Sequence, residues 1–277
     1  MTFQQKFDAI VSKHNSLLCV GLDSDRSQLP LIYEGNPDAQ LLFNQEIIEA
    51  THDLVCSYKL NSAFYEGQGA RGVEQLKQTC EYLYQTYPEV TVILDAKRGD
   101  IGSTNNGYEE YAFTYLGVDA ITLHPYLGKE ALQHFLNQKD KGIIILCRTS
   151  NPGAGELQDL SVDGVPLYQK IAQNVSRNWN ANGNCLLVVG ATYPEELAAV
   201  RKIVGEMTLL IPGIGAQGGD VEKTVKAGLN SKKAGMLISS SRGIIFASNG
   251  ADFAEKAREE AEKLKKEINL YRTTGGI

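Results

Sequence analysis

Two aspartates and a lysine lie close together near the middle of the chain. Residues 94–104 read Leu-Asp-Ala-Lys-Arg-Gly-Asp-Ile-Gly-Ser-Thr, which places Asp95, Lys97 and Asp100 directly after an apolar, β-branched run. Side chains of a strand alternate between its faces, so Asp95 and Lys97 are expected on the same face. A lone charge there would be costly, and a neighbouring opposite charge offsets that cost. The spacing predicts chemistry between paired charges at a strand end and leaves the reaction open.

The elements that must position these charges alternate along the chain. Short apolar runs, typical of strands covered on both faces, occupy residues 17–22, 54–60, 90–94, 120–123, 142–147, 185–189, 208–211 and 235–238. Segments with helical periodicity lie between them, such as residues 39–52, 72–85, 108–116, 167–179, 195–204 and 252–268. This alternation predicts a parallel (β/α)₈ TIM barrel of the α/β class, with an open doubly wound sheet as the alternative.

The length and even composition predict one domain. A closed α/β barrel uses about 250 residues, and no linker divides this chain of 277 residues. Residues 1–277 are therefore expected to form a single barrel domain with an N-terminal helix, a C-terminal helix and a short tail. The net charge of -6, without long runs of either sign, makes nucleic acid an unexpected partner.

The sequence also predicts a cytoplasmic location and no membrane partner. The N-terminus lacks the features of a signal peptide, and no apolar stretch of about 18 residues could span a bilayer. Four cysteines lie in apolar runs, and no Cys-x-x-Cys pair is present: Cys19, Cys56, Cys147 and Cys185. They are interpreted as buried, reduced thiols.

Polar residues follow most of the expected strands, where barrel enzymes carry their reacting groups. A lone Asp or Ser at such a place is more often a helix N-cap than a catalyst. So many polar strand ends together favour a shared site. They include Asp23, Lys59, Asn61, Asp95, Lys97, His124, Thr149, Ser150, Ser241 and Arg242.

Two segments predict a phosphate site. Glycines between residues 213 and 219 would let backbone N–H groups approach an anion, and barrels commonly hold phosphate after strands seven and eight. Arg242 would add a planar charged fork. The glycine segment lacks the spacing of a dinucleotide-binding turn. It could also be a plain flexible connection, or a lid that brings Gln217 to the substrate.

A metal site is not expected. Asp23, Asp95 and Asp100 could in principle gather Mg²⁺, but Lys59 and Lys97 project into the same mouth and would repel a divalent cation. The four histidines show no zinc-ligand spacing.

Together these motifs resemble the orotidine 5′-phosphate decarboxylase family, in its longer bacterial branch. The resemblance rests on Asp95-x-Lys97-x-x-Asp100-Ile101, extended to Thr104, and on the segment from Pro212 to Gly219. Further matching segments follow in order, at residues 20–23, 59–61, 149–155 and 241–242. Related barrels share the Asp-x-Lys-x-x-Asp core but use Mg²⁺, so a Mg²⁺-dependent sugar-phosphate decarboxylase or aldolase is the alternative within this group.

The resemblance implies a carboxy-lyase without metal or cofactor that converts orotidine 5′-monophosphate to uridine 5′-monophosphate and CO₂ in de novo pyrimidine biosynthesis. Loss of CO₂ leaves a carbanion whose lone pair lies in the ring plane, so the ring carbonyls cannot delocalise it. A cation about 4 Å away would contribute about 4 kcal/mol at an effective dielectric constant of 20. The family assigns that cation to Lys97, which then protonates the carbon.

The resemblance also implies the other roles. Asp95 and Asp100 would flank Lys97, and Lys59 would link the charges. Asp100, Ile101 and Thr104 would reach the site of a second subunit, which implies a homodimer with shared sites, although residues alone leave Asp100 equally suited to a helix N-cap. Asp23 and Lys59 would bind the ribose, Ser150 the pyrimidine, and Gln217 and Arg242 the phosphate.

Two other classes of function are weighed against this one. A Schiff-base aldolase would need a lysine, Lys59 or Lys97, with a lowered pKa, whereas the neighbouring carboxylates would raise it. A non-catalytic sensor of phosphate ligands would not need so many charged groups at the mouth of the barrel.

Overall fold

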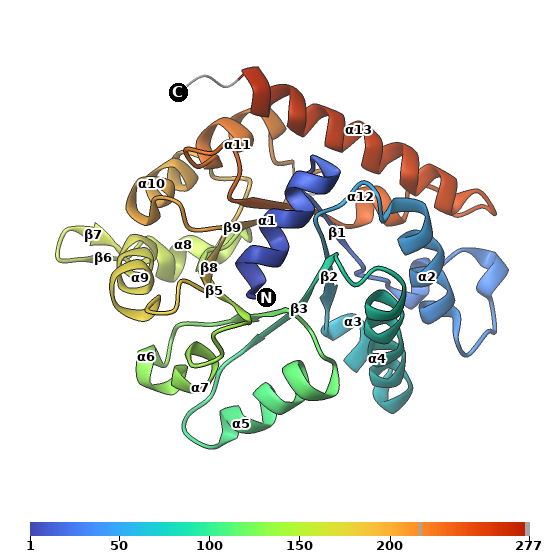
Figure 1. The fold of residues 1–277 in the computed structure, drawn as a ribbon, viewed down its shortest axis with the longest axis horizontal. Coiled ribbons are helices and arrows are strands. Elements are labelled where there is room, and N and C mark those ends of the chain that lie inside the picture. Colours follow the sequence, from blue (N-terminus) through green and yellow to red (C-terminus); the bar gives the residue numbers. More distant parts are fainter. Residues whose placement is uncertain (216–217, 275–277) are drawn as a thin grey trace.

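The chain folds into a closed barrel of parallel strands surrounded by helices (Figure 1). The computed structural model describes residues 1–215 and 218–274, and within these residues eight strands form the barrel. In chain order they are β1 (Leu18–Gly21), β2 (Ser57–Asn61), β3 (Thr91–Arg98), β4 (Ala120–Leu123), β5 (Gly142–Arg148), β8 (Cys185–Val189), β9 (Leu209–Pro212) and β10 (Met236–Ser240). Each strand pairs with its predecessor, and β10 pairs with β1. The predicted fold class is confirmed, and the open sheet is wrong.

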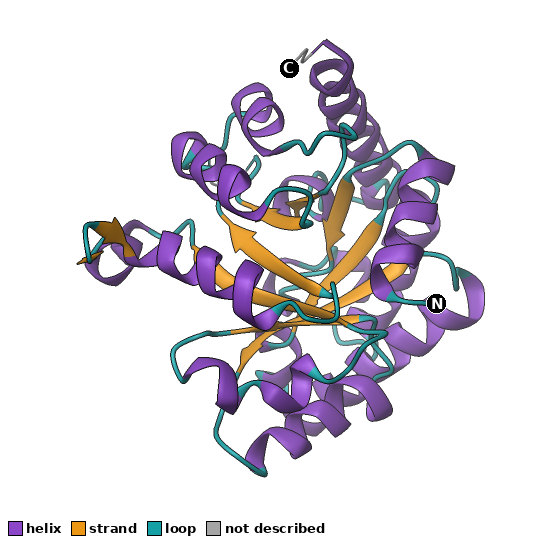
Figure 2. Ribbon diagram, turned by 60° about the vertical axis from the view of Figure 1, so that its left-hand side comes forward, coloured by secondary structure: helices purple, strands orange, loops and turns teal. Residues whose placement is uncertain are grey.

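Helices cover the outside of the barrel, and Figure 2 shows the strands enclosed by them. A small hairpin, β6 (Ser161–Val162) and β7 (Val165–Pro166), projects beside the helix that follows it. The α-helices are α1 (Phe3–His14), α2 (Ala39–Thr51), α3 (Ala63–Glu66), α4 (Gly69–Thr86), α5 (Thr104–Glu109), α6 (Gly128–Ala131), α7 (Gln133–Leu136), α8 (Gly155–Gln158), α9 (Leu167–Asn174), α10 (Pro194–Val204), α11 (Val221–Gly228), α12 (Arg242–Ile245) and α13 (Phe253–Thr274).

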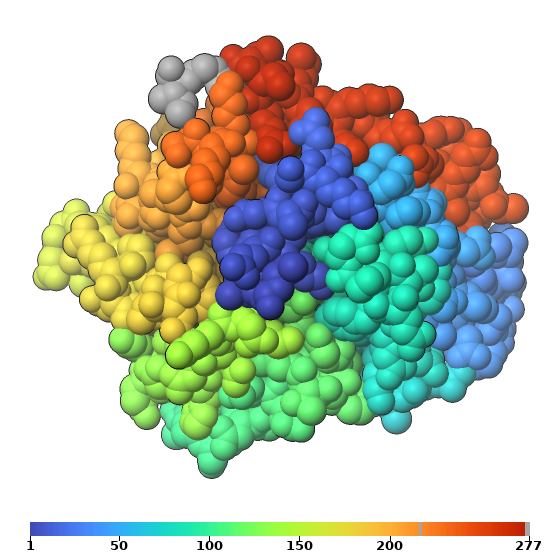
Figure 3. Space-filling view, in the orientation of Figure 1, coloured from blue at the N-terminus to red at the C-terminus, as the bar shows by residue number. Residues whose placement is uncertain are grey.

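The N-terminal helix α1 closes one end of the barrel. In the space-filling view it lies across the centre of the molecule (Figure 3). Phe3 and Phe7 are buried, and a Cβ at Gly142, the first residue of β5, would lie 2.8 Å from the Phe3 ring. Since this contact is at the start of β5, α1 covers the N-terminal ends of the strands. The opposite end, where the strands terminate, carries the polar residues.

The strands are apolar on both faces because the barrel interior and the helices cover them. Every residue of β8 is buried, for example. All five cysteines are buried free thiols, which confirms the interpretation of the cysteines. None of the helices in the described part of the chain is long and apolar enough to cross a membrane.

Candidate active site

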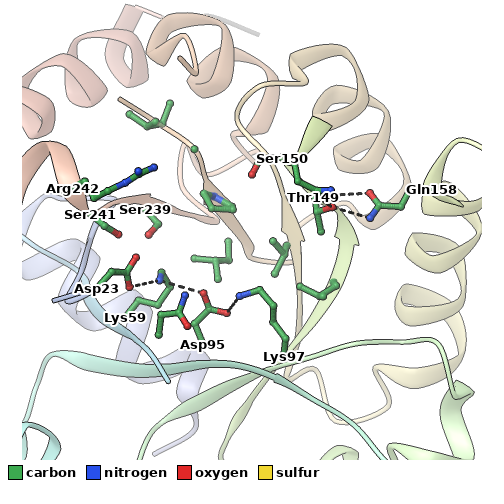
Figure 4. A pocket seen from close by; sticks show the side chains of 18 residues that line it. Asp23, Lys59, Asp95, Lys97, Thr149, Ser150, Gln158, Ser239, Ser241 and Arg242 are labelled. Atoms are coloured by element: carbon green, nitrogen blue, oxygen red, sulfur yellow. Dashed lines mark hydrogen bonds and ion pairs between the residues drawn. The ribbon is translucent and has the colours of Figure 1, made fainter. Parts of the chain in front are cut away.

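A cavity of about 550 Å³ opens at the C-terminal ends of the strands (Figure 4). Its wall combines charged and polar side chains with an apolar portion formed by Leu146, Val188, Leu210, Pro212 and Ile214. The polar lining residues come from five strands, β1, β2, β3, β5 and β10, or the segments that follow them. They are Asp23, Lys59, Asn61, Asp95, Lys97, Thr149, Ser150, Asn151, Gln158, Ser239, Ser241 and Arg242.

Four of these side chains form a row of alternating charges. Lys59 Nζ lies 3.1 Å from Asp23 Oδ1 and 3.3 Å from Asp95 Oδ2. Lys97 Nζ lies 2.7 Å from Asp95 Oδ1. Figure 4 shows the row running from Asp23 to Lys97 across the floor of the cavity. The predicted pairing of Asp95 with Lys97 is confirmed, and Lys59 links it to the end of β1.

Electrostatics keep the two central members of this row, Asp95 and Lys59, ionised near neutral pH. Burial raises the pKa of Asp95, but Lys59 and Lys97 outweigh burial and lower it to about 2. Burial lowers the pKa of Lys59, but Asp23 and Asp95 outweigh it and raise this pKa above its ordinary value. A Schiff-base nucleophile needs the opposite shift. The geometry therefore argues against Lys59 as an aldolase nucleophile.

The backbone at the end of β3 is irregular. Leu94 pairs with Ile121 and Arg98 with Leu123, so three residues of β3 lie opposite Thr122 alone. Lys97 has a φ of 49°, a left-handed conformation that costs a non-glycine residue about 1–2 kcal/mol. The expectation of regular alternation through Lys97 was therefore wrong, although the side chains of Asp95 and Lys97 do meet. Strand periodicity cannot reveal such a bulge.

His124 supports this segment and does not line the cavity. Its Nε2 lies 3.0 Å from the carbonyl oxygen of Gly99, and its backbone N–H donates to the carbonyl of Arg98 at 3.0 Å. A Cβ at Gly99 would lie 2.8 Å from His124 Nε2, and the φ of Gly99 is 153°. His124 thus packs against the turn that leads from Lys97 to Asp100.

Gln158 holds the loop after β5 through two hydrogen bonds. This residue was not among the site residues predicted from the sequence. The Thr149 N–H donates to Gln158 Oε1 at 2.9 Å, and Gln158 Nε2 donates to Thr149 Oγ1 at 2.8 Å. Ser150 lies next to these hydrogen bonds and against Gly190, where a Cβ would be 2.9 Å from the Ser150 Cβ. Ser150 therefore faces the cavity from a tightly fixed backbone.

The side expected to hold phosphate contains the described glycines of the segment after β9 and the start of α12. Gly213 and Gly215 have φ values of 104° and 80°, which suit glycine. Arg242 is the first residue of α12 and lines the cavity. Within residues 1–215 and 218–274, no acidic side chain lies within 4.0 Å of its guanidinium. Gln217 lies outside the described residues.

Three predicted site residues do not line this cavity. Asp100 Oδ1 accepts from the N–H of Ile101 at 2.7 Å, and the Asp100 N–H donates to Asn105 Oδ1 at 2.9 Å. Ile101 is 62% exposed, and Thr104, the first residue of α5, is also exposed. The residue that precedes α5 is Ser103, so Asp100 is not the N-cap of this helix. Within one chain, the structure separates Asp100, Ile101 and Thr104 from the other predicted residues.

The side chains that could bind a metal are not arranged as a metal centre in the part of the chain that the structure describes. Among the residues that the structure describes, no three His, Cys, Asp or Glu side chains cluster as metal ligands. The two carboxylates in the cavity, Asp23 and Asp95, both face Lys59.

Comparison with known proteins adds a consistent set of relatives. A model of the Orotidine 5′-phosphate decarboxylase / HUMPS family matches residues 16–257. Orotidine 5′-phosphate decarboxylases from Janthinobacterium sp. (strain Marseille) and Cupriavidus metallidurans are 50% and 52% identical over 241 residues, which are 87% of this chain and 88% of each relative. The structure of Leishmania donovani OMP decarboxylase superposes with a TM-score of 0.85 at 37% identity, and the match covers 99% of both chains.

Proposed function

The chain belongs to the Orotidine 5′-phosphate decarboxylase / HUMPS family, and we propose that the cavity at its strand ends is where orotidine 5′-monophosphate loses CO₂. The activity itself, a carboxy-lyase reaction of pyrimidine biosynthesis, follows from the family and from relatives that are about half identical to this chain over 87% of its length. The assignment of that activity to particular side chains rests on the geometry above.

The observation that carries the assignment is the contrast between the two lysines of the charge row. The side chain of Lys59 is 5% exposed and lies between two carboxylates, whereas the side chain of Lys97 is 48% exposed and, among the carboxylates of the described residues, pairs with Asp95 alone. Lys97 is therefore free to face a substrate. Its ammonium would stabilise the carbanion left by CO₂ and then donate a proton to that carbon.

The apolar side of the cavity supports this chemistry. Leu146, Val188 and Leu210 line it and offer a departing CO₂ no polar partner. A site that excludes water strengthens the attraction between an ammonium and a carbanion, because the effective dielectric constant falls. Asp95 holds Lys97 in place and would lie near the substrate carboxylate.

The remaining residues are proposed to bind the other parts of the nucleotide. Asp23 and Lys59 would bind ribose hydroxyls, and Ser150 would contact the pyrimidine from its fixed loop. Arg242 would bind the phosphate, together with Gln217. Phosphate lies far from the bond that breaks, so its binding energy would serve to position the reacting part of the substrate.

We further propose a homodimer with shared sites, in the cytoplasm. Asp100, Ile101 and Thr104 lie outside their own chain's cavity, and Ile101 exposes 62% of its surface. A second copy could receive these residues at its own charge row, where Asp100 would add a carboxylate beside Lys97. Five buried free thiols agree with a compartment that keeps cysteines reduced.

One assay tests the proposed function. The purified protein is treated with a chelator, and the loss of orotate absorbance is followed with orotidine 5′-monophosphate as substrate. Turnover without added metal is expected. No turnover, or turnover only after addition of Mg²⁺, would contradict the proposal.

The variant Lys97→Ala tests the assignment within the site. It should reduce kcat by about 10³-fold or more because the carbanion loses its cation. Binding of uridine 5′-monophosphate, measured by calorimetry, should remain because the ribose and phosphate contacts are untouched. Unchanged turnover would remove Lys97 from its role.

A further inference from the structure

Thr122 is the residue of β4 that faces the bulge of β3. The paired residues on either side of it are Ile121 with Leu94 and Leu123 with Arg98, so Thr122 alone spans the three bulged residues. Its side chain is fully buried. We propose that Thr122 is the positioning residue that aims the Lys97 ammonium at the reacting carbon, an inference that rests on the proposed function of Lys97.

The hydroxyl of Thr122 makes two hydrogen bonds whose directions are fixed by their partners. It lies 2.9 Å from the backbone N–H of Lys97, which can only donate. It also lies 2.9 Å from Asp95 Oδ1, and an ionised carboxylate can only accept. The single hydroxyl proton therefore goes to Asp95, and an oxygen lone pair receives the N–H of Lys97. No other arrangement satisfies both contacts.

These bonds fix Lys97 at both of its ends. The backbone N–H is held by Thr122, and Nζ is held 2.7 Å from Asp95 Oδ1, the same oxygen that Thr122 contacts. Lys97, Asp95 and Thr122 thereby close a ring of hydrogen bonds. A long lysine side chain has many rotamers, and a ring that holds both ends removes most of them.

The bulge explains why a side chain is needed there. Three residues opposite one leave the Lys97 N–H without a partner in the regular ladder between β3 and β4. The left-handed φ of 49° at Lys97 also has to be maintained by surrounding contacts. Thr122 supplies the acceptor for the Lys97 N–H and also restrains the backbone of Lys97. Its β-branched side chain suits this role because it is stiff at χ1.

The test compares Thr122→Val, which keeps the shape and loses both bonds, with Thr122→Ser, which keeps the hydroxyl. Thr91→Val is the matched control, because Thr91 is also fully buried and donates to the carbonyl of Cys56 at 2.9 Å, but at the other end of β3. Thr122→Ala is measured as well, so that the loss of both hydrogen bonds can still be tested if Thr122→Val does not fold. Each variant is assayed for kcat, KM and deuterium exchange at the Lys97 amide.

Thr122→Val should lower kcat by about tenfold or more and change KM by less than about threefold, because the aim of the ammonium matters in the transition state. The Lys97 amide should exchange about tenfold faster or more once its acceptor is gone. Thr122→Ala should show the same changes as Thr122→Val. Thr122→Ser should restore kcat and the exchange rate of the Lys97 amide to within about threefold of the unsubstituted protein. Thr91→Val should leave both unchanged.

Three results would overturn the inference: a Thr122→Val enzyme with normal kcat, a serine variant that fails to restore it, or unchanged exchange at Lys97. An equal loss in Thr91→Val would also overturn it, by showing that any buried hydroxyl of β3 or β4 matters. The exchange measurement does not depend on turnover. Failure of the unsubstituted protein to decarboxylate its substrate would therefore count against the proposed function alone.

Discussion

Asp95 accepts hydrogen bonds from its own strand, β3, and from the two strands beside it. Its Oδ1 receives Lys97 Nζ from β3 at 2.7 Å and Thr122 Oγ1 from β4 at 2.9 Å, while Oδ2 faces Lys59 Nζ from β2 at 3.3 Å. A carboxylate offers about four lone-pair sites, so the protein itself uses most of them. Asp95 is therefore a structural partner of two lysines as well as a group that lines the cavity.

Asp95 should make the stability of the fold depend on pH under acidic conditions. The lysines outweigh the effect of burial and lower its pKa to about 2, from an ordinary value of 3.8. A carboxyl with a lowered pKa in the folded state stabilises that state above its unfolded pKa, and the gain is lost as pH falls. The shift corresponds to about 2 kcal/mol, lost between about pH 4 and about pH 2.

Urea denaturation of the unsubstituted protein and of Asp95→Asn measures this contribution. At neutral pH the variant should lose about 3–5 kcal/mol of unfolding free energy, because two lysines are left without their shared partner. The difference in unfolding free energy between the two proteins should narrow as the pH falls below about 4. A difference that stays constant with pH would show that the Asp95 charge is not its source.

Single residues also show where sequence reasoning stops. Asp95, Lys97 and Lys59 could be predicted to share a site because each lies at a strand end of a barrel. Gln158 could not, since its role depends on where α8 returns to the strand ends, and an isolated glutamine carries no pattern. Thr122 lies in an apolar run, and its importance comes from a bulge on another strand.

At the scale of elements, the apolar pattern predicted strand positions well and strand ends poorly. β4 and β8 begin and end at the predicted residues, Ala120–Leu123 and Cys185–Val189. β3 instead continues to Arg98, because Asp95 still pairs with Asn61 and Arg98 with Leu123 although the apolar residues have stopped. Charged residues can thus extend a strand when they line a cavity, which hydropathy does not record.

The helix predictions show the same limit. The predicted segments 108–116 and 167–179 are helical, but each ends in a wider π-helical turn, Glu110–Tyr115 and Val175–Trp179. α13 continues to Thr274, six residues beyond the predicted end at residue 268. There, Arg272 and Asn269 bond to the loop that follows α1, through Asn15. These tertiary contacts prolong the helix, and local periodicity does not include them.

One half-buried arginine ties several elements together at the end of the barrel opposite the site. Arg201 of α10 donates to the carbonyls of Gly205, Met207, Gly228 and Gly235, at 2.6, 2.6, 2.8 and 2.9 Å. Met207 lies two residues before the start of β9, and Gly235 directly precedes β10. Burial lowers the pKa of this guanidinium to about 10, which still leaves it charged at neutral pH.

Arg201→Met should therefore destabilise the fold without touching the chemistry. We expect a loss of about 2–4 kcal/mol of unfolding free energy, since charged hydrogen bonds disappear and carbonyls are left unpaired. Denaturant unfolding measures this loss, and kcat should stay within about twofold of the unsubstituted enzyme. Arg201→Lys keeps a charge but not the planar fork, and it should recover only part of the stability. A large fall in kcat at normal stability would be evidence against this role.

The whole molecule separates its two ends by function. α1 closes the end where the strands begin, and the charge row occupies the end where they terminate. This division could be predicted from alternating strands and helices together with the positions of polar residues. The separation of Asp100 from the cavity that holds Lys97 could not be derived from spacing. Asp100 follows Lys97 by only three positions, and the turn at Gly99 redirects the chain between them.

A mixing experiment tests the proposed homodimer with shared sites. Lys97→Ala and Asp100→Asn are each expected to be nearly inactive as homodimers. After the two are unfolded and refolded together, random pairing makes half of the dimers mixed. If Asp100 serves the second subunit, each mixed dimer has one site with both changes and one intact site, so about a quarter of normal activity should return.

The recovery depends on which chain Asp100 serves. If it acted on Lys97 of its own chain, every site in a mixed dimer would carry one of the two changes, and mixing would restore nothing. A Lys97→Ala and Asp95→Asn mixture is the matched control, because the structure places both groups in the same cavity, 2.7 Å apart. That mixture should regain no activity, since both residues act in one chain and no pairing creates an intact site.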